Sequence, residues 1–179
     1  MRGEDLGDDG VDEAGVGYLF QATLFDDPIH RAFAGPQRLE DFLAHLAAER
    51  AVVDAGDEVL FPSPYWVSYP EMIRLAGGIP VPLSPRDGGL VPSAADIVDR
   101  IGPRTRAVIL NSPNNPSGLC LPDSVVAAVV EACESRDIWL ISDDIYHRLV
   151  FDGRKDRGCA RFAKRKGDDS RLVIVNGVS

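Results

Sequence analysis

The sequence predicts an α/β fold: a mainly parallel sheet with helices on both faces. Three short stretches, 106–111, 138–143 and 172–177, are almost continuously apolar, which is typical of strands buried on both faces. Other stretches, among them 68–78 and 123–137, carry apolar residues at helical spacing. Buried strands that alternate with amphipathic helices indicate a parallel sheet covered on both sides.

The first predicted element is a helix over residues 36–51, where apolar residues recur at intervals of three and four. The residues in this stripe are Leu39, Phe42, Leu43 and Leu46. Residues 1–17 are acidic and glycine-rich with almost nothing to bury, so they are predicted to be flexible. We therefore expect three parts: this flexible N-terminus, a helical segment over 18–53, and a sheet-forming domain over 54–179.

A strand, a helix and a second strand are predicted next. EVLF (58–61) has the apolar character of a short strand. Residues 68–78 read as a helix that starts with a capping box from Ser68 to Glu71 and ends at a glycine pair. IPVPL (79–83) is extended, and its two prolines restrict it to an edge of the sheet or to a short strand. The helix face predicted to be buried consists of Tyr69, Met72, Ile73 and Ala76.

The remaining helices lie between the three apolar strands. Residues 93–103 form a predicted helix with Ser93 as its N-cap, Asp96 at the third helical position, and a Gly-Pro stop. Residues 123–137 form a longer helix with valines and a cysteine on one face. Each of these helices would cover a face of the sheet.

Composition excludes several classes of protein. The chain of 179 residues is long enough for one domain with a hydrophobic core. A net charge of −9 argues against nucleic-acid binding, and no apolar run is long enough to span a membrane. The three cysteines have no C-x-x-C spacing, and no secretory signal is visible. We expect a soluble, cytoplasmic protein.

Polar and aromatic residues follow the predicted strands at the same edge of the sheet. The segments after the four strands are PSPYWVSYP (62–70), SPNNPSG (112–118), DDIYHR (143–148) and GVS (177–179). In open parallel sheets, ligands bind at the carboxyl ends of the strands. The sequence therefore predicts a ligand site at this edge.

Each candidate residue also has a purely structural interpretation. Trp66 would fit as a plug between strand and helix, and Asn114 and Asn115 would fit as turn residues beside proline and glycine. Tyr146 would fit in a core.

Two adjacent carboxylates, Asp143 and Asp144, would fit a helix cap or, with His147, a divalent metal. Because adjacent side chains point in different directions, the pair makes a poor metal site, and no metal is predicted.

Taken together, these motifs resemble those of the pyridoxal-phosphate (PLP) aminotransferases of class I/II, whose fold is that of aspartate aminotransferase. The matching stretches are GDEVLFPSPYWVSYPEMIRLAGGIPV (56–81), RAVILNSPNNPSG (106–118), LISDDIYHRLVFDG (140–153) and VIVNGVS (173–179). The resemblance covers the last two-thirds of the chain, and less than half of a full family member. PYWVSYPEM is similar to the branch with bacterial aspartate and prephenate aminotransferases.

The resemblance implies a role for each candidate. Asp143 would accept a hydrogen bond from the pyridine nitrogen of PLP and keep it protonated, so that the ring can act as an electron sink. The family usually has Glu where Asp144 stands. Asn115 and Tyr146 would donate to the phenolic oxygen of the cofactor, and Trp66 would stack on its ring. The implied reaction is amino-group transfer between an amino acid and a 2-oxo acid.

Two departures from the family limit what the resemblance implies. The lysine that forms the Schiff base would come directly after Ser179, where this sequence ends, so no catalytic residue is assigned and the chain alone is expected to be inactive. The glycine-rich turn that cradles the cofactor phosphate has no counterpart in residues 18–53, so no phosphate-binding residue is assigned.

Three interpretations of this pattern remain open: a truncated aminotransferase, a non-catalytic partner of an intact aminotransferase, and one half of a split enzyme. Homodimers or heterodimers with an intact aminotransferase are the expected assemblies.

Overall fold

The computed structural model describes residues 45–151 and 158–176. The predicted flexible stretch 1–17 and the first half of the helix predicted over 36–51, with Leu39, Phe42 and Leu43, lie outside the described residues. Residues 45–52 are helical, which agrees with the second half of that helix.

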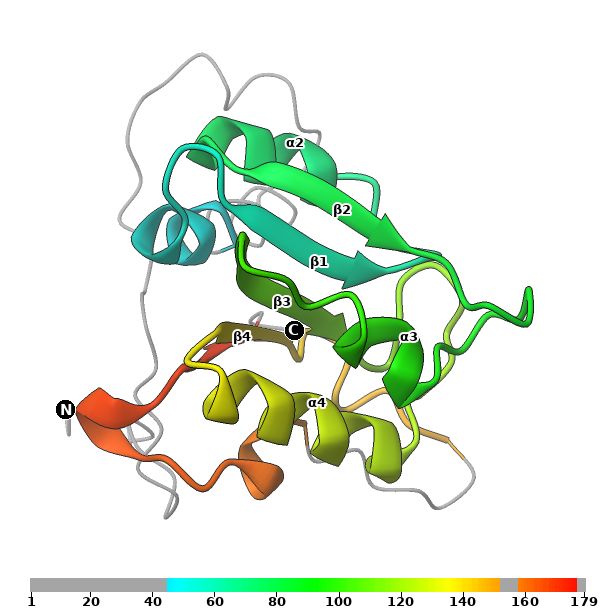
Figure 1. Cartoon of the computed structure of the whole chain (residues 1–179). Coiled ribbons are helices and arrows are strands. Elements are labelled where there is room, and N and C mark those ends of the chain that lie inside the picture. Colours follow the sequence, from blue (N-terminus) through cyan, green and yellow to red (C-terminus); the bar gives the residue numbers. More distant parts are fainter. Residues whose placement is uncertain (1–44, 152–157, 177–179) are drawn as a thin grey trace, which may run out of the picture.

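Five strands form one sheet, and every pair of neighbours is parallel. Their order across the sheet is β2-β1-β3-β4-β5. The strands are β1 (Glu58–Pro62), β2 (Ile79–Leu83), β3 (Thr105–Asn111), β4 (Trp139–Asp143) and β5 (Leu172–Val175). Five predicted strands are thus confirmed, each within a residue or two of its expected bounds, and Figure 1 shows them side by side.

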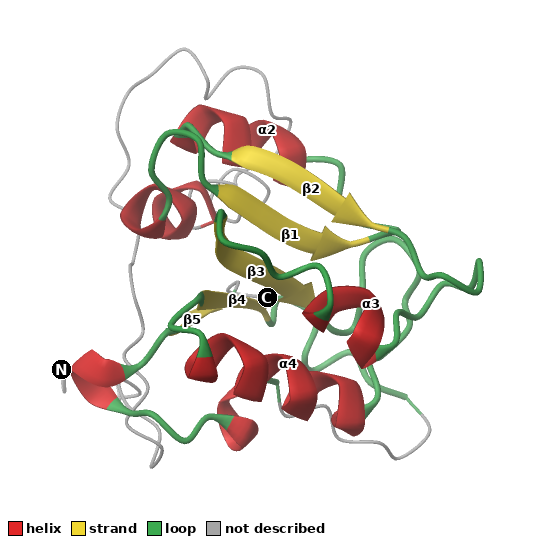
Figure 2. Ribbon diagram, in the orientation of Figure 1, coloured by secondary structure: helices red, strands yellow, loops and turns green. Residues whose placement is uncertain are grey.

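Helices cover both faces of the sheet, as expected for buried parallel strands. The helix at 45–52 and α2 (Tyr69–Ala76) lie on one face, and α3 (Ala94–Val98) and α4 (Asp123–Ser135) lie on the other (Figure 2). The 3-10 turns η2 (Ala160–Phe162) and η3 (Gly167–Asp169) precede β5. The α/β prediction with helices on both faces is confirmed.

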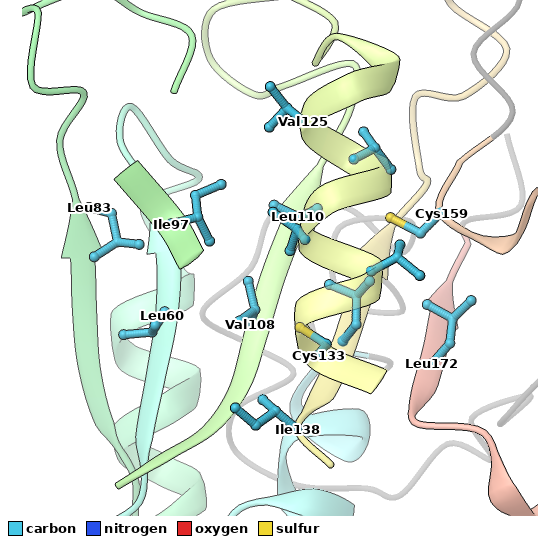
Figure 3. Packing of buried hydrophobic residues seen from close by; sticks show 14 of the residues in the cluster. Leu60, Leu83, Ile97, Val108, Leu110, Val125, Cys133, Ile138, Cys159 and Leu172 are labelled. Atoms are coloured by element: carbon cyan, nitrogen blue, oxygen red, sulfur yellow. The ribbon is translucent and has the colours of Figure 1, made fainter. Parts of the chain in front are cut away.

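Each face of the sheet has its own hydrophobic core, because successive residues of a strand point to opposite faces. On β3, Val108 and Leu110 pack under α3 and α4, whereas Ala107 and Ile109 pack under α2 and the helix at 45–52. Figure 3 shows the first of these cores, where Val125 and Cys133 of α4 point toward the strands.

The proline-containing strand β2 lies at one edge of the described sheet, as its sequence predicts. The amide of Ile79 donates to the carbonyl of Asp57 at the start of β1, at 2.7 Å. Since amides of alternate residues point to the same side of a strand, Pro80 and Pro82 face away from β1. Neither can donate a hydrogen bond to a further strand.

The start of α2 differs from the prediction. Ser68 has helical backbone angles (φ −80°, ψ −21°), and its side chain makes no capping hydrogen bond. The predicted capping box is therefore wrong: Glu71 forms an ion pair with Arg74 one turn later. The predicted end of the helix is confirmed, since Gly77 has a left-handed φ of 96° and its amide donates to Arg74.

The capping box at the start of α3 is confirmed. The Ser93 hydroxyl accepts from the Asp96 amide at 3.2 Å, and the Asp96 carboxylate accepts from the Ser93 amide at 2.8 Å. The helix is shorter than the predicted 93–103, because after Val98 the chain continues in turns.

Candidate functional site

The carboxyl ends of β3 and β4 lie side by side and hold the first two elements of the site. In the strand register Asn111 is the partner of Asp143, so the two residues end their strands together. The side-chain amide of Asn111 donates to the backbone carbonyl of Asp143 at 3.0 Å. Its side-chain oxygen accepts from the backbone amide of Asn115 at 2.6 Å. Asn111 therefore fixes the loop after β3 against the end of β4.

Asn114 organises the turn itself. Its side-chain oxygen accepts from both the amide and the hydroxyl of Ser117, and its side-chain amide donates to the carbonyl of Pro64 at 3.1 Å. This last bond ties the loop after β3 to the loop after β1. Asn114 therefore has the structural role of a turn residue.

Asn115 points its side chain elsewhere. Its amide donates to the hydroxyl of Tyr146 at 3.3 Å, although 31 positions separate the two residues in the chain. Both side chains are half-buried. The two groups predicted to share one acceptor are therefore neighbours in the folded chain.

Trp66 belongs to an aromatic group above the end of β1. Its indole makes edge contacts with Tyr69, at 5.6 Å between ring centroids, and with the imidazole of His45, at 5.4 Å. Tyr69 also packs on Phe61 of β1. Trp66 is half-buried, so part of its ring remains accessible beside the polar groups of the site.

Asp143 is buried, and its two carboxylate oxygens have different surroundings. Oδ2 accepts the hydroxyl proton of Tyr69 and lies 3.0 Å from Nε2 of His45. Oδ1 has a long contact of 3.3 Å with the amide of Ile145. Burial, and after it the nearby Asp143 carboxylate, raise the pKa of Tyr69 well above its usual value, so this phenol stays a donor.

Sequence reasoning missed two residues at this site, His45 and Glu49. Both are fully buried on the helix at 45–52, one turn apart and therefore on the same side. Continuing the apolar stripe of that helix by three residues beyond Leu46 reaches Glu49, and this was the available signal. Burial raises the pKa of Glu49 to about 8, against a smaller opposite effect of His45.

Asp144 and His147 are held by local bonds. The hydroxyl of Ser142 donates to Asp144 Oδ1 at 2.6 Å, and Nδ1 of His147 lies 2.6 Å from the Asp144 backbone carbonyl. Within the described residues, no group of three or more histidine, cysteine or acidic side chains is arranged to hold a metal ion.

Comparison with known proteins agrees with this arrangement. The sequence model of the family described as "Aminotransferase class I and II" matches residues 44–179, more than half of the chain. The chain belongs to this family.

Relatives in the family include two bacterial enzymes. The aspartate/prephenate aminotransferase of Thermus thermophilus is 45% identical over 131 residues, which are 73% of this chain and 32% of that protein. The aspartate aminotransferase of Bacillus subtilis is 37% identical over 131 residues, covering 73% of this chain and 33% of that protein. The chain thus spans about one third of the length of these relatives.

Solved structures of aminotransferases share the fold. Aspartate aminotransferase from Thermus thermophilus with maleate superposes with a TM-score of 0.67 and 38% identity, over 78% of this chain and 35% of that one. N-succinyldiaminopimelate aminotransferase from Mycobacterium tuberculosis gives 0.65 and 33%, over 76% and 35%.

Aminotransferases of this family use PLP, and the residues of this chain fit the part of the cofactor that they would contact. Oδ1 of Asp143 has no strong donor among the described residues, which leaves it open to a ring N–H. The amide nitrogen of Asn115 and the hydroxyl of Tyr146 lie 3.3 Å apart, close enough for both to reach a single acceptor oxygen. None of the described helices is long and apolar enough to cross a membrane.

Proposed function

We propose that this chain supplies one wall of the PLP site of an aminotransferase that moves an amino group between an amino acid and a 2-oxo acid. The observation that carries the proposal is the convergence of Trp66, Asp143 and the Asn115–Tyr146 pair at the carboxyl edge of the sheet. When bound, PLP supplies the electron sink for the reaction.

The chain's own residues would have three tasks. Asp143 would hold a proton on the ring nitrogen by accepting a charge-assisted hydrogen bond at Oδ1, because Oδ2 is already used by Tyr69. Asn115 and Tyr146 would hold the phenolic oxygen, and Trp66 would cover one face of the ring and exclude water. No described feature favours a non-catalytic partner or half of a split enzyme.

Binding can be tested by fluorescence, because the chain has only two tryptophans, Trp66 and Trp139. In a Trp139→Phe background we expect PLP to quench the emission of Trp66. Adding Asp143→Asn should weaken binding by about tenfold or more, the effect of losing one charged hydrogen bond. Asp168→Asn, which neutralises an exposed carboxylate, is the matched control. Equal quenching curves for Asp143→Asn and its control would contradict the proposed role.

For the reaction itself, aspartate and prephenate are the first substrates to assay, as the names of the relatives suggest. The assay belongs on the longest form of the protein that can be expressed, with release of the 2-oxo acid as the readout. Failure of both substrates to react there, with PLP bound, would count against this substrate class.

We also propose a second copy of the chain as partner. Three apolar side chains near the site are largely exposed, Val67 at 79%, Leu149 at 57% and Phe151 at 77%. A contiguous exposed apolar patch marks an interaction surface, and we propose that these side chains, which follow β1 and β4, contribute to one. Light scattering should give a dimer mass, and Val67→Asp with Phe151→Asp should shift it toward the monomer. A monomer for the unmodified chain would contradict this part of the proposal.

A further inference from the structure

Behind Asp143 lies a buried chain of ionisable groups, which touches Trp66 through His45. The helix at 45–52 brings His45 against Oδ2 of Asp143, at 3.0 Å from Nε2. Glu49 follows one turn later on the same side of the helix. All three residues are almost entirely buried, with exposures of 0%, 4% and 0% for His45, Asp143 and Glu49.

Glu49 stands out in this group. Both of its carboxylate oxygens are buried, and neither has a hydrogen-bond partner among the described residues. An ionised carboxylate without hydrogen bonds is very costly to bury, so the group must either be neutral or be compensated by a nearby cation. Among the described residues, His45 is the one cationic group that affects its ionisation.

Within the described part of the chain, the side chains around Glu49 supply no other compensating charge. On this face the sheet presents apolar side chains from β1, β3, β4 and β5, including Val59, Ile109, Ile141 and Val173. The phenol of Tyr69 on α2 also faces this group; burial raises its pKa, and a smaller electrostatic effect of Tyr146 adds to that rise.

Among the described residues, the guanidinium of Arg106 contacts this helix. It donates to the carbonyl of Val52 at the C-terminal end of the helix and lies 3.9 Å from Asp57, with a side chain 44% exposed. Its charge is therefore engaged at the surface and does not replace that of His45.

We propose that His45 is a positioning residue whose positive charge compensates the Asp143 carboxylate. Glu49 is the second acid beside the same imidazole, and its protonation state changes with pH. This inference rests on the proposed function, because it concerns the carboxylate expected to bind the cofactor ring nitrogen. At neutral pH the buried group holds an ionised Asp143, a protonated His45 and a neutral Glu49, with no net charge.

Proton balance gives this arrangement a defined response to pH. When Glu49 loses its proton, the group acquires one net negative charge, and the imidazolium is shared between two carboxylates. The compensation of Asp143 is then weaker, while Tyr69 still donates to Oδ2. Because burial places the pKa of Glu49 at about 8, the change falls just above neutral pH.

The charge of His45 can be measured without any cofactor. The chain has three histidines, His30, His45 and His147, so ¹⁵N-histidine NMR can assign the ring of His45 by comparison with His45→Gln. We expect imidazolium signals at pH 7 and an inflection of these signals near pH 8. In Glu49→Gln, an isosteric neutral variant, the inflection should be absent.

Glu131→Gln is the matched control, because Glu131 is an exposed carboxylate on α4, 72% accessible and 3.5 Å from Lys164. It should keep the inflection. A neutral His45 ring at pH 7, or an inflection that persists in Glu49→Gln, would overturn the proposal.

A second measurement links this group to the cofactor. In the Trp139→Phe background, quenching of Trp66 by PLP should weaken between pH 7 and pH 9, and Glu49→Gln should remove that pH dependence while Glu131→Gln keeps it. A pH dependence unchanged in Glu49→Gln would overturn the link to Asp143. Absence of any quenching at pH 7, with the NMR result as expected, would contradict the proposed function and leave the charge assignment of His45 supported.

Discussion

Glu49 is an acidic residue at a buried helix position that is usually occupied by an apolar side chain. The helix that carries it packs on this face of the sheet through Ala48 and Val52, in a core that also holds Met72 and Ile73. Natural proteins keep such a residue at a cost in stability, and that cost depends on pH through the ionisation of the carboxyl group.

The sign of this dependence follows from the two pKa values. Glu49 has an ordinary value of 4.5 in the unfolded chain and about 8 in the folded chain, so between these limits the folded state binds more protons. Its contribution is fully present below pH 4.5 and is lost as pH rises to 8. We expect the free energy of unfolding to fall by a few kcal/mol over this range.

Chemical denaturation at several pH values checks this prediction. Glu49→Gln should flatten the curve between pH 5 and pH 8, whereas the exposed Glu131→Gln should leave its slope unchanged. Parallel curves for the unmodified chain and Glu49→Gln would show that another group titrates.

At the scale of single elements, the loop after β3 depends on Asn111. Its buried side chain makes two bonds, one to the carbonyl of Asp143 and one from the amide of Asn115. Asn111→Ala leaves both backbone groups without these partners and should destabilise the chain by about 1–3 kcal/mol. Asn176→Ala, at an exposed position just after β5, is the control and should be nearly neutral. Thermal unfolding of both variants gives the comparison.

The turn between α2 and β2 depends on the absence of a side chain at Gly78. A Cβ there would lie 2.7 Å from Cγ1 of Val53 and 3.2 Å from the carbonyl of Asp57. Gly78→Ala should therefore cost about 1–3 kcal/mol through overpacking. At Gly102 no atom lies within 4 Å of such a Cβ, and its φ is not left-handed, so Gly102→Ala should cost little. Equal stabilities for the two variants would argue against close packing at this turn.

The elements themselves were largely predictable, because strands buried on both faces have continuous apolar sequences and the helices carry apolar residues at intervals of three and four. The same reasoning failed at Ser68, since a serine caps a helix only when its backbone is extended, and here it is helical. At Ser93 the backbone is extended, and the cap forms.

The location of the candidate site was predictable to the extent that its residues follow strands. Trp66, Asn115, Asp143 and Tyr146 could be expected at one edge because parallel strands deliver their carboxyl ends there, and the roles proposed for them come from the family resemblance. The contact of His45 with Asp143 could not be predicted, because His45 lies on a helix far from Asp143 in the sequence. That contact depends on how the helix packs across the sheet.

At the scale of the whole molecule, the two edges of the described sheet differ. On β2, Pro80 and Pro82 occupy the positions whose amides would face a further strand. Prolines at such positions protect an edge from pairing with another chain. Replacing both with valine should therefore create two outward amides on an extended, β-prone segment.

We expect Pro80→Val with Pro82→Val to raise self-association in a concentration-dependent way, measured by light scattering and by binding of an amyloid dye. A variant with valine at two exposed positions outside the sheet edge, Arg100→Val with Asp168→Val, controls for added apolar surface. Similar association of the two variants would assign the effect to hydrophobicity in place of strand pairing.

The order β2-β1-β3-β4-β5 has a consequence for synthesis on the ribosome. Once β1 and β2 have emerged and paired, β3 adds to the free edge of β1, β4 to β3 and β5 to β4. The described part of the nascent chain can therefore fold in the order of its synthesis, one strand at a time.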